Sequence, residues 1–587
     1  MGKRYEYKGF KPVWEQVPPP AGSFRSVLKW GSPQEFKEPN ERLYRYMKNV
    51  FGIGDEVFKE KKHEGLEPMP EELPVNLASE HIEKLKEIFG EAEVSTRAAD
   101  RIAVAYGKTM YDAYRLREGI LENIPDVVVF PSDHKQIVAL VEYCNTHKIP
   151  VYVYGGGSSV TRGVEAVKGG ITLDMRKNFN KVLNFNETNQ TITVQAGMSG
   201  PQLEAHLNNA QKEFNAKRAY TCRHFPQSFE YSSVGGWIVT RGAGQNSTYY
   251  GNIKDIVFQQ TYVTPAGIVK SYGLPAHAVG PDIDEIMMGS EGAFGILTDV
   301  TLRFFRYMPE NRKKFSFIFK SWQDGMNACR EIMQNESGFP SVFRLSDAEE
   351  TDMALKLYGV EGTIAEKLMN FFGYEPMQRC LFLGWTEGEK AFSKQLYKKV
   401  KRICKKHGGF FLTGKPVDGW EHGRFTDHYL RESLQDYGII IDTMECSVTW
   451  EMMPHVHEEV RKFTKSRPHT VCMTHLSHAY PQGANLYFIF IGLFKDKEEY
   501  VEYQYGIFDN IQKAGAAMSH HHGVGKMTAA WVEQSIGQTN FEIFKALKAH
   551  FDPNNIMNPG GTLGLDMTEA QKRKPKFAGK TWDSPEY

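Results

Sequence analysis

The chain has 587 residues, more than one hydrophobic core normally holds, so two or three domains are expected. Apolar residues make up 41% and charged residues 24%, values that exclude a largely disordered protein. Basic and acidic residues balance at 71 each, so no global field favours nucleic acid or an anionic membrane, and an anionic ligand must be bound locally.

The cysteines and the residues at both chain ends indicate in which cellular compartment the protein is expected. Seven cysteines lie far apart without a CxxC pair, which argues for reduced thiols and against a zinc site built on cysteine. No apolar signal segment opens the sequence, and no uncharged apolar run of about eighteen residues occurs. We expect a cytoplasmic or peripheral membrane protein; a peroxisomal location would suit a eukaryotic source, although residues 585–587 are not an SKL-type address.

The first part of the chain, residues 1–98, is rich in Pro, Lys and Glu. It predicts an irregular extension with short helices around Glu41–Met47 and His81–Phe89. The basic tail at Gln571–Lys576 has a similar composition. Both segments are expected to be solvated surface.

A strand that leads into glycines follows. Val127–Phe130 predicts a buried strand, and Ser132 is the expected N-cap of a helix that returns the chain to a strand at 151–154. That strand runs directly into Gly155, Gly156, Gly157, Ser158 and Ser159. Glycines let the backbone approach a phosphate, which N–H groups and serine hydroxyls can then bind. Taken alone, the triplet is equally consistent with an ordinary turn.

Two more polar and glycine-rich runs lie next to predicted strands: one extends from Pro226–Ser232 through Gly235 and Gly236 to Thr240–Gly244, and the other is Gly289–Gly295. Further elements are expected as strands at 171–175, 182–185, 191–196 and 296–305, a helix at 201–210, and a hairpin of 258–264 with 268–272. The runs match neither a Rossmann fingerprint nor a P-loop. They favour a dinucleotide held by several loops instead of one helix N-terminus.

Residues 306–515 have a different pattern, in which strands are followed by helices. Strands are expected at 315–319, 341–345, 380–385, 439–444 and 486–493, with helices at 322–335 and 390–407. This order favours an α+β domain with helices on one face of an antiparallel sheet, capping the preceding domain. After it come His520, His521 and His522, which are followed by a helix up to about Phe551.

These motifs, in the order GGGSS, PQSFEYS, TRGAG, GSEGAFG and HHHGVGK, resemble the vanillyl-alcohol-oxidase or PCMH-type FAD enzymes, and within them the ether-lipid-forming alkyldihydroxyacetonephosphate synthases. The resemblance covers roughly residues 100–560. It implies an extension at 1–98, a two-part FAD-binding domain at 99–305, a substrate-binding cap at 306–515, and a C-terminal segment at 516–587 that packs back on the FAD domain. The overall class is α+β.

The resemblance also implies residue roles. Tyr487 matches a catalytic acid/base, Arg344 an activity-critical arginine, Arg431 a substrate-binding arginine, and His520, His521 and His522 an essential histidine run. The residues that match FAD-contacting positions are Val153, Tyr154, Gly155, Gly156, Gly157, Ser158, Ser159, Pro226, Gln227, Ser228, Phe229, Glu230, Tyr231, Ser232, Thr240, Arg241, Gly242, Ala243, Gly289, Ser290, Glu291, Gly292, Ala293, Phe294 and Gly295. Ser158 and Ser159 stand where relatives with covalent flavin carry histidine, so the FAD is expected to be non-covalent.

The reaction implied is exchange of the acyl chain of 1-acyl-dihydroxyacetone phosphate for a long-chain fatty alcohol, through a substrate adduct at flavin N5. The expected partners are those two substrates and a second copy of the chain in a homodimer, with peripheral membrane contact and no nucleic acid. A phenol such as Tyr487 is a poor base at neutral pH, so a neighbouring histidine or arginine cation would help it.

Simpler readings of the same residues stay open. Tyr487 could be a core aromatic on an apolar strand, and the two arginines could form surface salt bridges. The histidines could bind a metal, but no carboxylate lies beside them in the sequence, so we expect them to bind substrate and flavin and expect no metal.

The alternative function is a D-2-hydroxy-acid dehydrogenase or oxidase of the same fold. Such enzymes carry metal-binding patterns HxGDGNxH and SxEHGxG. In this chain Tyr487 replaces a histidine of the first pattern and His521 replaces the glutamate of the second, so two metal ligands are missing.

Overall fold

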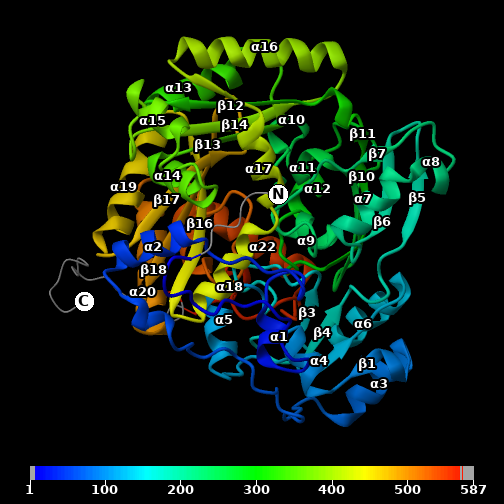
Figure 1. The fold of residues 1–587 in the computed structure, drawn as a ribbon. Helices are drawn as coiled ribbons and strands as arrows, with labels where there is room; N and C mark the ends of the chain where they lie inside the picture. Colours follow the sequence, from blue (N-terminus) through cyan, green and yellow to red (C-terminus); the bar gives the residue numbers. More distant parts are fainter. Residues whose placement is uncertain (1–6, 569–571, 573–587) are drawn as a thin grey trace.

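The computed structural model describes residues 7–568 and Lys572, and Figure 1 shows how the elements are arranged. The predicted tail at 571–576 therefore lies, apart from Lys572, outside the described residues. Within the described part no helix has both the length and the apolar composition needed to cross a membrane. The described strands form sheets of four, five, two and seven strands.

The four-stranded sheet carries the first glycine loop. Its order is β1 (Val94–Ser95), β2 (Val127–Val129), β4 (Ile171–Asp174), β3 (Val151–Tyr154), and β2, β4 and β3 are parallel. Helix α6 (His134–His147) connects β2 to β3 as predicted, but its N-cap is Asp133, not Ser132. The Asp133 side chain accepts from the backbone N–H of Gln136, whereas Ser132 donates to the Gln136 side chain. A carboxylate one residue later is the better placed acceptor.

The five-stranded antiparallel sheet completes the half of the molecule for which FAD binding is expected, called the FAD-binding half below. Its order is β5 (Val182–Asn186), β6 (Thr191–Gln195), β10 (Ile296–Arg303), β8 (Val257–Thr264), β9 (Gly267–Lys270). The predicted hairpin is confirmed as β8 and β9. The strand predicted at 296–305 instead divides, because Phe305–Arg306 forms β11 and pairs with β7 (Tyr220–Thr221). The helix expected at 201–210 is α7 (Gly200–Asn208).

The seven-stranded sheet, called the cap sheet below, is antiparallel throughout, which confirms the α+β prediction. Its order is β15 (Phe410–Thr413), β12 (Lys313–Phe319), β14 (Cys380–Thr386), β13 (Val342–Ser346), β17 (Val471–Ser477), β18 (Gly483–Leu493), β16 (Ile439–Thr449). β16 runs five residues beyond its predicted end at Met444, and β17 and β15 were not expected.

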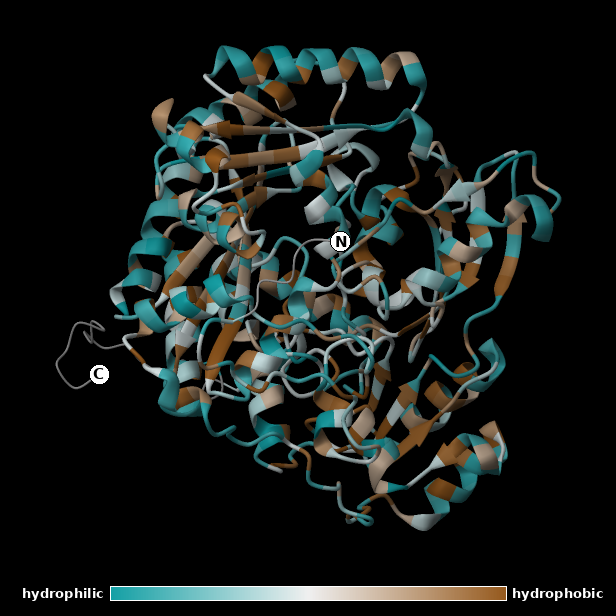
Figure 2. Cartoon of the chain, in the orientation of Figure 1, coloured by the Kyte–Doolittle hydropathy of each residue, from teal (hydrophilic) through white to brown (hydrophobic). Residues whose placement is uncertain are grey.

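Helices cover both faces of the cap sheet, so the prediction of helices on one face is wrong. α13 (Trp322–Gln334), α16 (Lys390–Lys406), α19 (Met453–Ser466) and α20 (Lys497–Lys513) pack in one core with Leu486, Phe488 and Phe490 of β18. On the opposite face lie α14 (Ala348–Leu357) and α17 (Lys415–Gly423), which contribute Met353 and Val417 to separate clusters. Figure 2 shows the hydrophilic outer side of α16.

The N-terminal extension is packed against the cap and is not simply solvated surface. The two predicted helices are confirmed as α2 (Glu41–Phe51) and α3 (Ser79–Phe89). Trp14, Tyr44 and Met47 are buried in a cluster that also contains cap residues from β16, β17 and β18. The composition of the extension, rich in Pro, Lys and Glu, predicted an exposed segment. A few large aromatic and apolar side chains nevertheless bury enough surface to hold it against the cap.

A buried ionic network ties the extension to the cap. Arg25 of α1 (Phe24–Leu28) and Arg117 of α5 (Met110–Arg117) both donate to Asp436 Oδ1, at 2.6 and 2.7 Å. All three side chains are at most 2% exposed. Asp436 directly follows the helix α18 (Leu430–Gln435). Its carboxylate therefore joins three segments that are distant in the sequence.

We predict that Asp436→Ala lowers the free energy of unfolding by about 3–5 kcal/mol, because it leaves two buried guanidinium groups without their shared counter-charge. Urea unfolding followed by tryptophan fluorescence measures the change. Glu87→Ala, which removes the partner of Lys84 in an exposed ion pair, is the control and should change stability little. Equal effects of the two substitutions would contradict the structural role given to Asp436.

Candidate functional site

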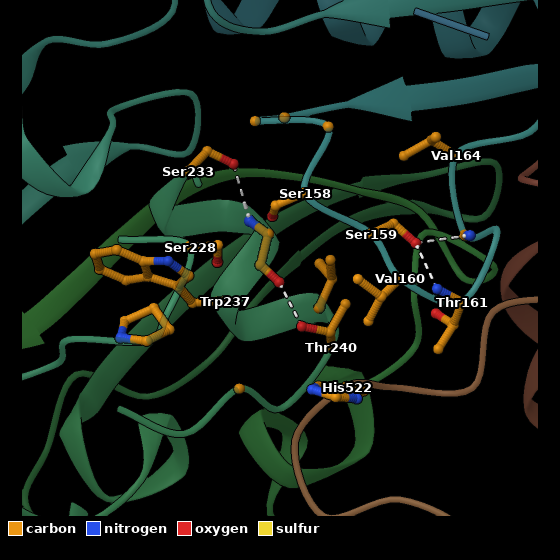
Figure 3. Close-up of a pocket in the computed structure, with 18 of the residues that line it drawn as sticks. Ser158, Ser159, Val160, Thr161, Val164, Ser228, Ser233, Trp237, Thr240 and His522 are labelled. Carbon is orange, nitrogen blue, oxygen red and sulfur yellow. Dashed lines mark hydrogen bonds between the residues drawn. The ribbon is translucent and has the colours of Figure 1, made fainter. Parts of the chain in front are cut away.

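A cavity of about 250 Å³ lies where the glycine loops meet the cap sheet. Ser158, Ser159, Ser228 and Thr240 line one part of it, and His522 lines another, as Figure 3 shows. The sequence-predicted residues on its wall are Val153, Gly155, Gly156, Gly157, Ser158, Ser159, Pro226, Gln227, Ser228, Thr240, Gly242, Ala243, Glu291, Gly292, Gly295, Arg431, Tyr487, His521 and His522. The cavity thus unites the flavin-type loops with the polar cap residues.

The first loop requires glycine because other backbone lies against it. A Cβ atom on Gly156 would lie 2.1 Å from the Tyr231 carbonyl oxygen and 2.6 Å from Ser232 Cα. On Gly155 it would lie 2.2 Å from the Ser233 hydroxyl oxygen. The loop then turns at Ser159, whose Oγ accepts from the N–H groups of Thr161 and Gly163 (Figure 3). One side of the loop therefore packs against residues 231–233, and residues 155–159 also line the cavity.

The second loop continues into α9 (Val234–Val239). Ser233 Oγ accepts from the Gly236 N–H, and Thr240 Oγ1 donates to the Gly236 carbonyl, so α9 is held at both ends (Figure 3). Several predicted flavin contacts do not line the cavity, namely Tyr154, Phe229, Glu230, Tyr231, Ser232, Arg241, Gly289, Ser290, Ala293 and Phe294. Arg241, for example, binds Glu285, and Phe229 packs on Trp237. Such residues support the loops from behind.

The third loop holds the C-terminal segment. Glu291 accepts from the backbone N–H groups of Val524 and Gly525, each at 2.6 Å. Burial raises the pKa of Glu291 to about 7 despite these two hydrogen bonds. Its backbone carbonyl accepts from Asn558 Nδ2, and Asn558 Oδ1 accepts from Lys526. Asn558 lines the cavity and was not singled out by the sequence.

Tyr487 points from β18 toward the FAD-binding half. Its hydroxyl lies 3.1 Å from Thr443 Oγ1 and 3.3 Å from Gln227 Oε1, so the single O–H can donate to Gln227 while the oxygen accepts from the Thr443 hydroxyl. Its ring stacks on His475 with centroids 4.9 Å apart. Burial raises the pKa of Tyr487 well above its usual value, and no neighbouring cation reverses this. The phenol therefore keeps its proton at neutral pH. Of the histidine or arginine cation expected to assist it, Arg344 lowers the Tyr487 pKa, but by less than burial raises it.

Arg344 acts on Tyr487 through two intermediates. It donates to Glu350 Oε1 at 2.6 Å, and the same oxygen lies 3.1 Å from His475 Nδ1. Burial alone would raise the pKa of Glu350, but His475 and Arg344 lower it to about 2. A second cavity of about 30 Å³ is lined by Arg344, His475 and Tyr487 together. Arg344 therefore lines this small cavity and not the main one, and its ion pair with Glu350 is largely buried.

Arg431 lies on α18 at another part of the main cavity. Its Nη2 donates to the Lys108 carbonyl at 3.0 Å, and its guanidinium lies over the Trp30 ring at 5.3 Å. Trp30 also stacks on His428, with centroids 5.1 Å apart. Trp30 belongs to the N-terminal extension and lines the cavity, which its surroundings in the sequence did not indicate.

Burial lowers the pKa of each of the three histidines from its usual value, which favours their neutral forms. His520 Nε2 lies 2.8 Å from the Tyr480 hydroxyl, and only His521 and His522 line the main cavity. The sequence argument that no carboxylate lies beside them is wrong, because the fold brings Glu445 of β16 against them. Glu445, His520 and His521 have ligand atoms within 4.8 Å of one another.

Comparisons with known proteins agree with this geometry. The model of an FAD binding domain matches residues 125–273, and that of the C-terminal domain of FAD linked oxidases matches residues 308–562. Alkyldihydroxyacetonephosphate synthase of Caenorhabditis elegans is 30% identical, covering 80% of this chain and 81% of the relative. YgcU of Escherichia coli K12, an uncharacterized FAD-linked oxidoreductase, is 30% identical, covering 82% and 97%. A solved alkyldihydroxyacetonephosphate synthase structure has a TM-score of 0.74 at 26% identity, covering 88% and 92%.

FAD is the cofactor that these findings assign, and the cavity fits it. The glycine loops have no room for Cβ atoms where the backbone comes together, and Ser158, Ser159 and Thr240 offer hydroxyls to phosphate oxygens. Met175, Val239 and Leu297 add an apolar wall suited to a flat ring system. Ser158 follows the glycines where a covalent link would need histidine.

We predict that Gly156→Ala weakens FAD binding about 10-fold or more, because overpacking against the Tyr231 backbone costs about 1–3 kcal/mol and displaces the loop. FAD content is measured by acid denaturation, which should release the flavin into solution because it is not covalently held. Gly419→Ala is the control, since its Cβ would make only an ordinary contact of 3.7 Å with Tyr358. Full flavin content in Gly156→Ala, or yellow flavin left on the acid-denatured chain, would contradict this account.

Proposed function

Because the chain belongs to the alkyldihydroxyacetonephosphate synthase family of FAD-dependent enzymes, we propose that it forms the ether bond of ether lipids. The substrates are a 1-acyl-dihydroxyacetone phosphate and a long-chain fatty alcohol, and the products are alkyl-dihydroxyacetone phosphate and a fatty acid. The observation that carries the proposal is that one cavity contains the glycine loops together with Arg431, Tyr487 and His522.

The exchange is balanced without an external electron acceptor. The carbon beside the ketone loses a proton and regains one, its bond to the acyl oxygen breaks, and a bond to the alcohol oxygen forms. The proton of the alcohol leaves with the carboxylate. Bound FAD would supply the electrophilic centre that this exchange needs, while the protein binds the substrate and moves the protons.

We assign the protein's part from the protonation states. Arg431 binds the phosphate through parallel N–H donors. His522 is neutral because burial lowers its pKa, so it can accept the proton from carbon. Tyr487 keeps its proton because burial raises its pKa, so it can donate to the departing carboxylate or return a proton to carbon. Rings of Tyr487 and His522 are 5.5 Å apart, close enough to serve one substrate.

The hydroxy-acid dehydrogenase alternative requires a metal that polarises the substrate hydroxyl. Tyr487 occupies one place where that site needs histidine. Glu445 does lie beside His520 and His521, but its Oε1 accepts from three backbone N–H groups of the histidine loop, which a metal at that oxygen would displace. The geometry therefore favours the acyl-for-alkyl exchange.

We predict that Tyr487→Phe lowers kcat by about 10²–10⁴-fold while the flavin spectrum is kept, because the proton-carrying hydroxyl is lost and the ring remains. The assay incubates the protein with palmitoyl-dihydroxyacetone phosphate and labelled hexadecanol and measures the alkyl product without any electron acceptor. Tyr106→Phe is the matched control, since its buried hydroxyl donates to the Glu122 carbonyl outside the cavity.

Two results would contradict this proposal. Retained activity in Tyr487→Phe would remove the hydroxyl from the mechanism. Acceptor-dependent oxidation of D-lactate or D-2-hydroxyglutarate by the unchanged protein, with no alkyl product, would replace ether-bond formation by the alternative function.

We further propose that the protein contacts a lipid surface through the segment around α15 (Ile364–Phe371). Ile364 is 77% and Phe371 82% exposed, and Phe372 stacks on the exposed Phe410. α16 carries lysines and an arginine and no acidic residue, and just after its C-terminal end the Gly408 carbonyl accepts from the Tyr374 hydroxyl, close to this segment. Apolar side chains near the end of such a cationic helix suit an anionic bilayer, which is also where the proposed substrates reside.

We predict that Phe371→Ser with Phe372→Ser lowers binding to phosphatidylcholine vesicles containing phosphatidylserine about 10-fold or more, because two large apolar side chains no longer enter the bilayer. Cosedimentation measures binding, and Val279→Ser, at another residue that is 64% exposed, is the control. Unchanged vesicle binding would contradict the lipid surface. A shift from dimer to monomer in light scattering, without loss of vesicle binding, would assign the segment to the expected homodimer instead.

A further inference from the structure

The loop that carries the histidines is held by a residue that has no role in the function described above. Glu445 lies in β16, and its carboxylate is only 2% exposed. It is paired across the sheet with Tyr487, which in turn is paired with His475. Cross-strand partners point to the same face of a sheet. Glu445 therefore shares the cavity-facing side of the cap sheet with the proposed proton donor.

Its carboxylate receives an unusual number of hydrogen bonds from one short segment. Oε1 accepts from the Ser519 hydroxyl at 2.7 Å and from the N–H groups of His520, His521 and His522 at 2.9, 3.0 and 3.0 Å. Oε2 accepts from the His520 N–H at 2.7 Å. Burying a charged carboxylate costs free energy unless hydrogen-bond donors surround it. The Ser519–His522 donors therefore stabilise the charge of Glu445, and Glu445 in turn holds these donors in place.

These contacts also bear on the grouping of Glu445, His520 and His521, whose ligand atoms lie within 4.8 Å of one another. Oε1 accepts four of the hydrogen bonds, whereas Oε2 accepts only the His520 N–H, which it shares with Oε1. A cation bound at Oε1 would therefore displace hydrogen bonds that hold the loop, while Oε2 keeps a free lone pair. The metal content of the purified protein distinguishes a loop-positioning role of Glu445 from a metal-binding role.

A second buried carboxylate holds the other end of the same loop. Glu291, from the FAD-binding half, accepts from the N–H groups of Val524 and Gly525, at 2.6 Å each. Glu445 comes from the cap sheet. The segment 519–525 is thus fixed at both ends by carboxylates from the two halves of the molecule, with His521 and His522 exposed to the cavity between them.

We propose that Glu445 is a positioning residue, which fixes the backbone of residues 519–522 so that His521 and His522 face the substrate next to Tyr487. The inference rests on the proposed function for the chemistry that the histidines perform, but not for the ordering of the loop. Precise placement matters because a side chain displaced by about 1 Å can lose much of its catalytic effect.

The test compares Glu445→Gln with Glu349→Gln in the flavin-loaded full-length protein. The amide introduced by Glu445→Gln could still offer one oxygen, but its NH₂ group would face the N–H of His520, and the negative charge would be lost. Glu349 is a matched control: its carboxylate is 3% exposed and binds Arg461 and Lys465 away from the histidine loop. Ser519→Ala, which removes one donor to Glu445 and one of the two acceptors of the His522 N–H, is a second and milder variant.

Hydrogen exchange of the peptide containing 519–525 reports the ordering directly. We expect faster hydrogen exchange of the backbone amides of residues 520–522 in Glu445→Gln, a smaller increase in Ser519→Ala, and no change in Glu349→Gln.

We also expect kcat for the acyl-for-alkyl reaction to fall about 10–100-fold in Glu445→Gln, while KM and FAD content stay unchanged. Unchanged exchange in the loop peptide, or KM and kcat altered equally in the variant and in the Glu349→Gln control, would overturn the inference.

Two further readouts separate this inference from its alternatives. Hydrogen exchange of the 519–525 peptide could increase in Glu445→Gln although the wild-type protein makes no alkyl product. In that case the proposed function fails and the positioning role of Glu445 stands. If the purified protein contains one equivalent of a divalent metal that Glu445→Gln loses, the carboxylate is a metal ligand and the positioning role is overturned.

Discussion

The register of the cap sheet is the constraint on which the site depends. Pairing of β16, β18 and β17 places Glu445, Tyr487 and His475 in one row on the same face. A slip of one residue would turn all three toward the core that Leu486 and Phe488 occupy. The long antiparallel pairing over Ile439–Thr449 and Gly483–Leu493 makes that slip costly, because every apolar residue of β18 would change faces.

Burial then determines which groups can carry protons. The row lies on the buried side of the cap sheet that faces the glycine loops, where charged forms are disfavoured unless they are paired. N–H donors and neighbouring basic groups lower the pKa values of Glu350 and Glu445 and so favour their ionised forms. For Tyr487 and His522 burial outweighs the opposing charges, Arg344 for Tyr487 and Glu445 for His522, and favours the neutral forms. One environment thus separates charged residues that hold the site from neutral residues that can exchange protons.

The N-terminal extension completes the enclosure. Asp436 ties Arg25 and Arg117 to the end of α18, and Trp30 lies under the Arg431 guanidinium of the same helix. The extension therefore supports the arginine to which we assign the phosphate and forms part of the cavity wall. Helix α18 therefore links the packing of the extension to the geometry of the proposed phosphate site at Arg431.

The sequence by itself determined the elements with strong local signals: the strand before Gly155, the β8–β9 hairpin, the apolar strand around Tyr487 and the cofactor implied by the order of the glycine loops. Only the tertiary structure decided which of the predicted residues reach the cavity, and it added Trp30, Thr443 and Asn558. It also placed Glu445 beside His520, which lies 75 residues away in the chain. Periodicity reports which side of an element is buried, but contacts between distant segments depend on strand register and packing, which no local pattern contains.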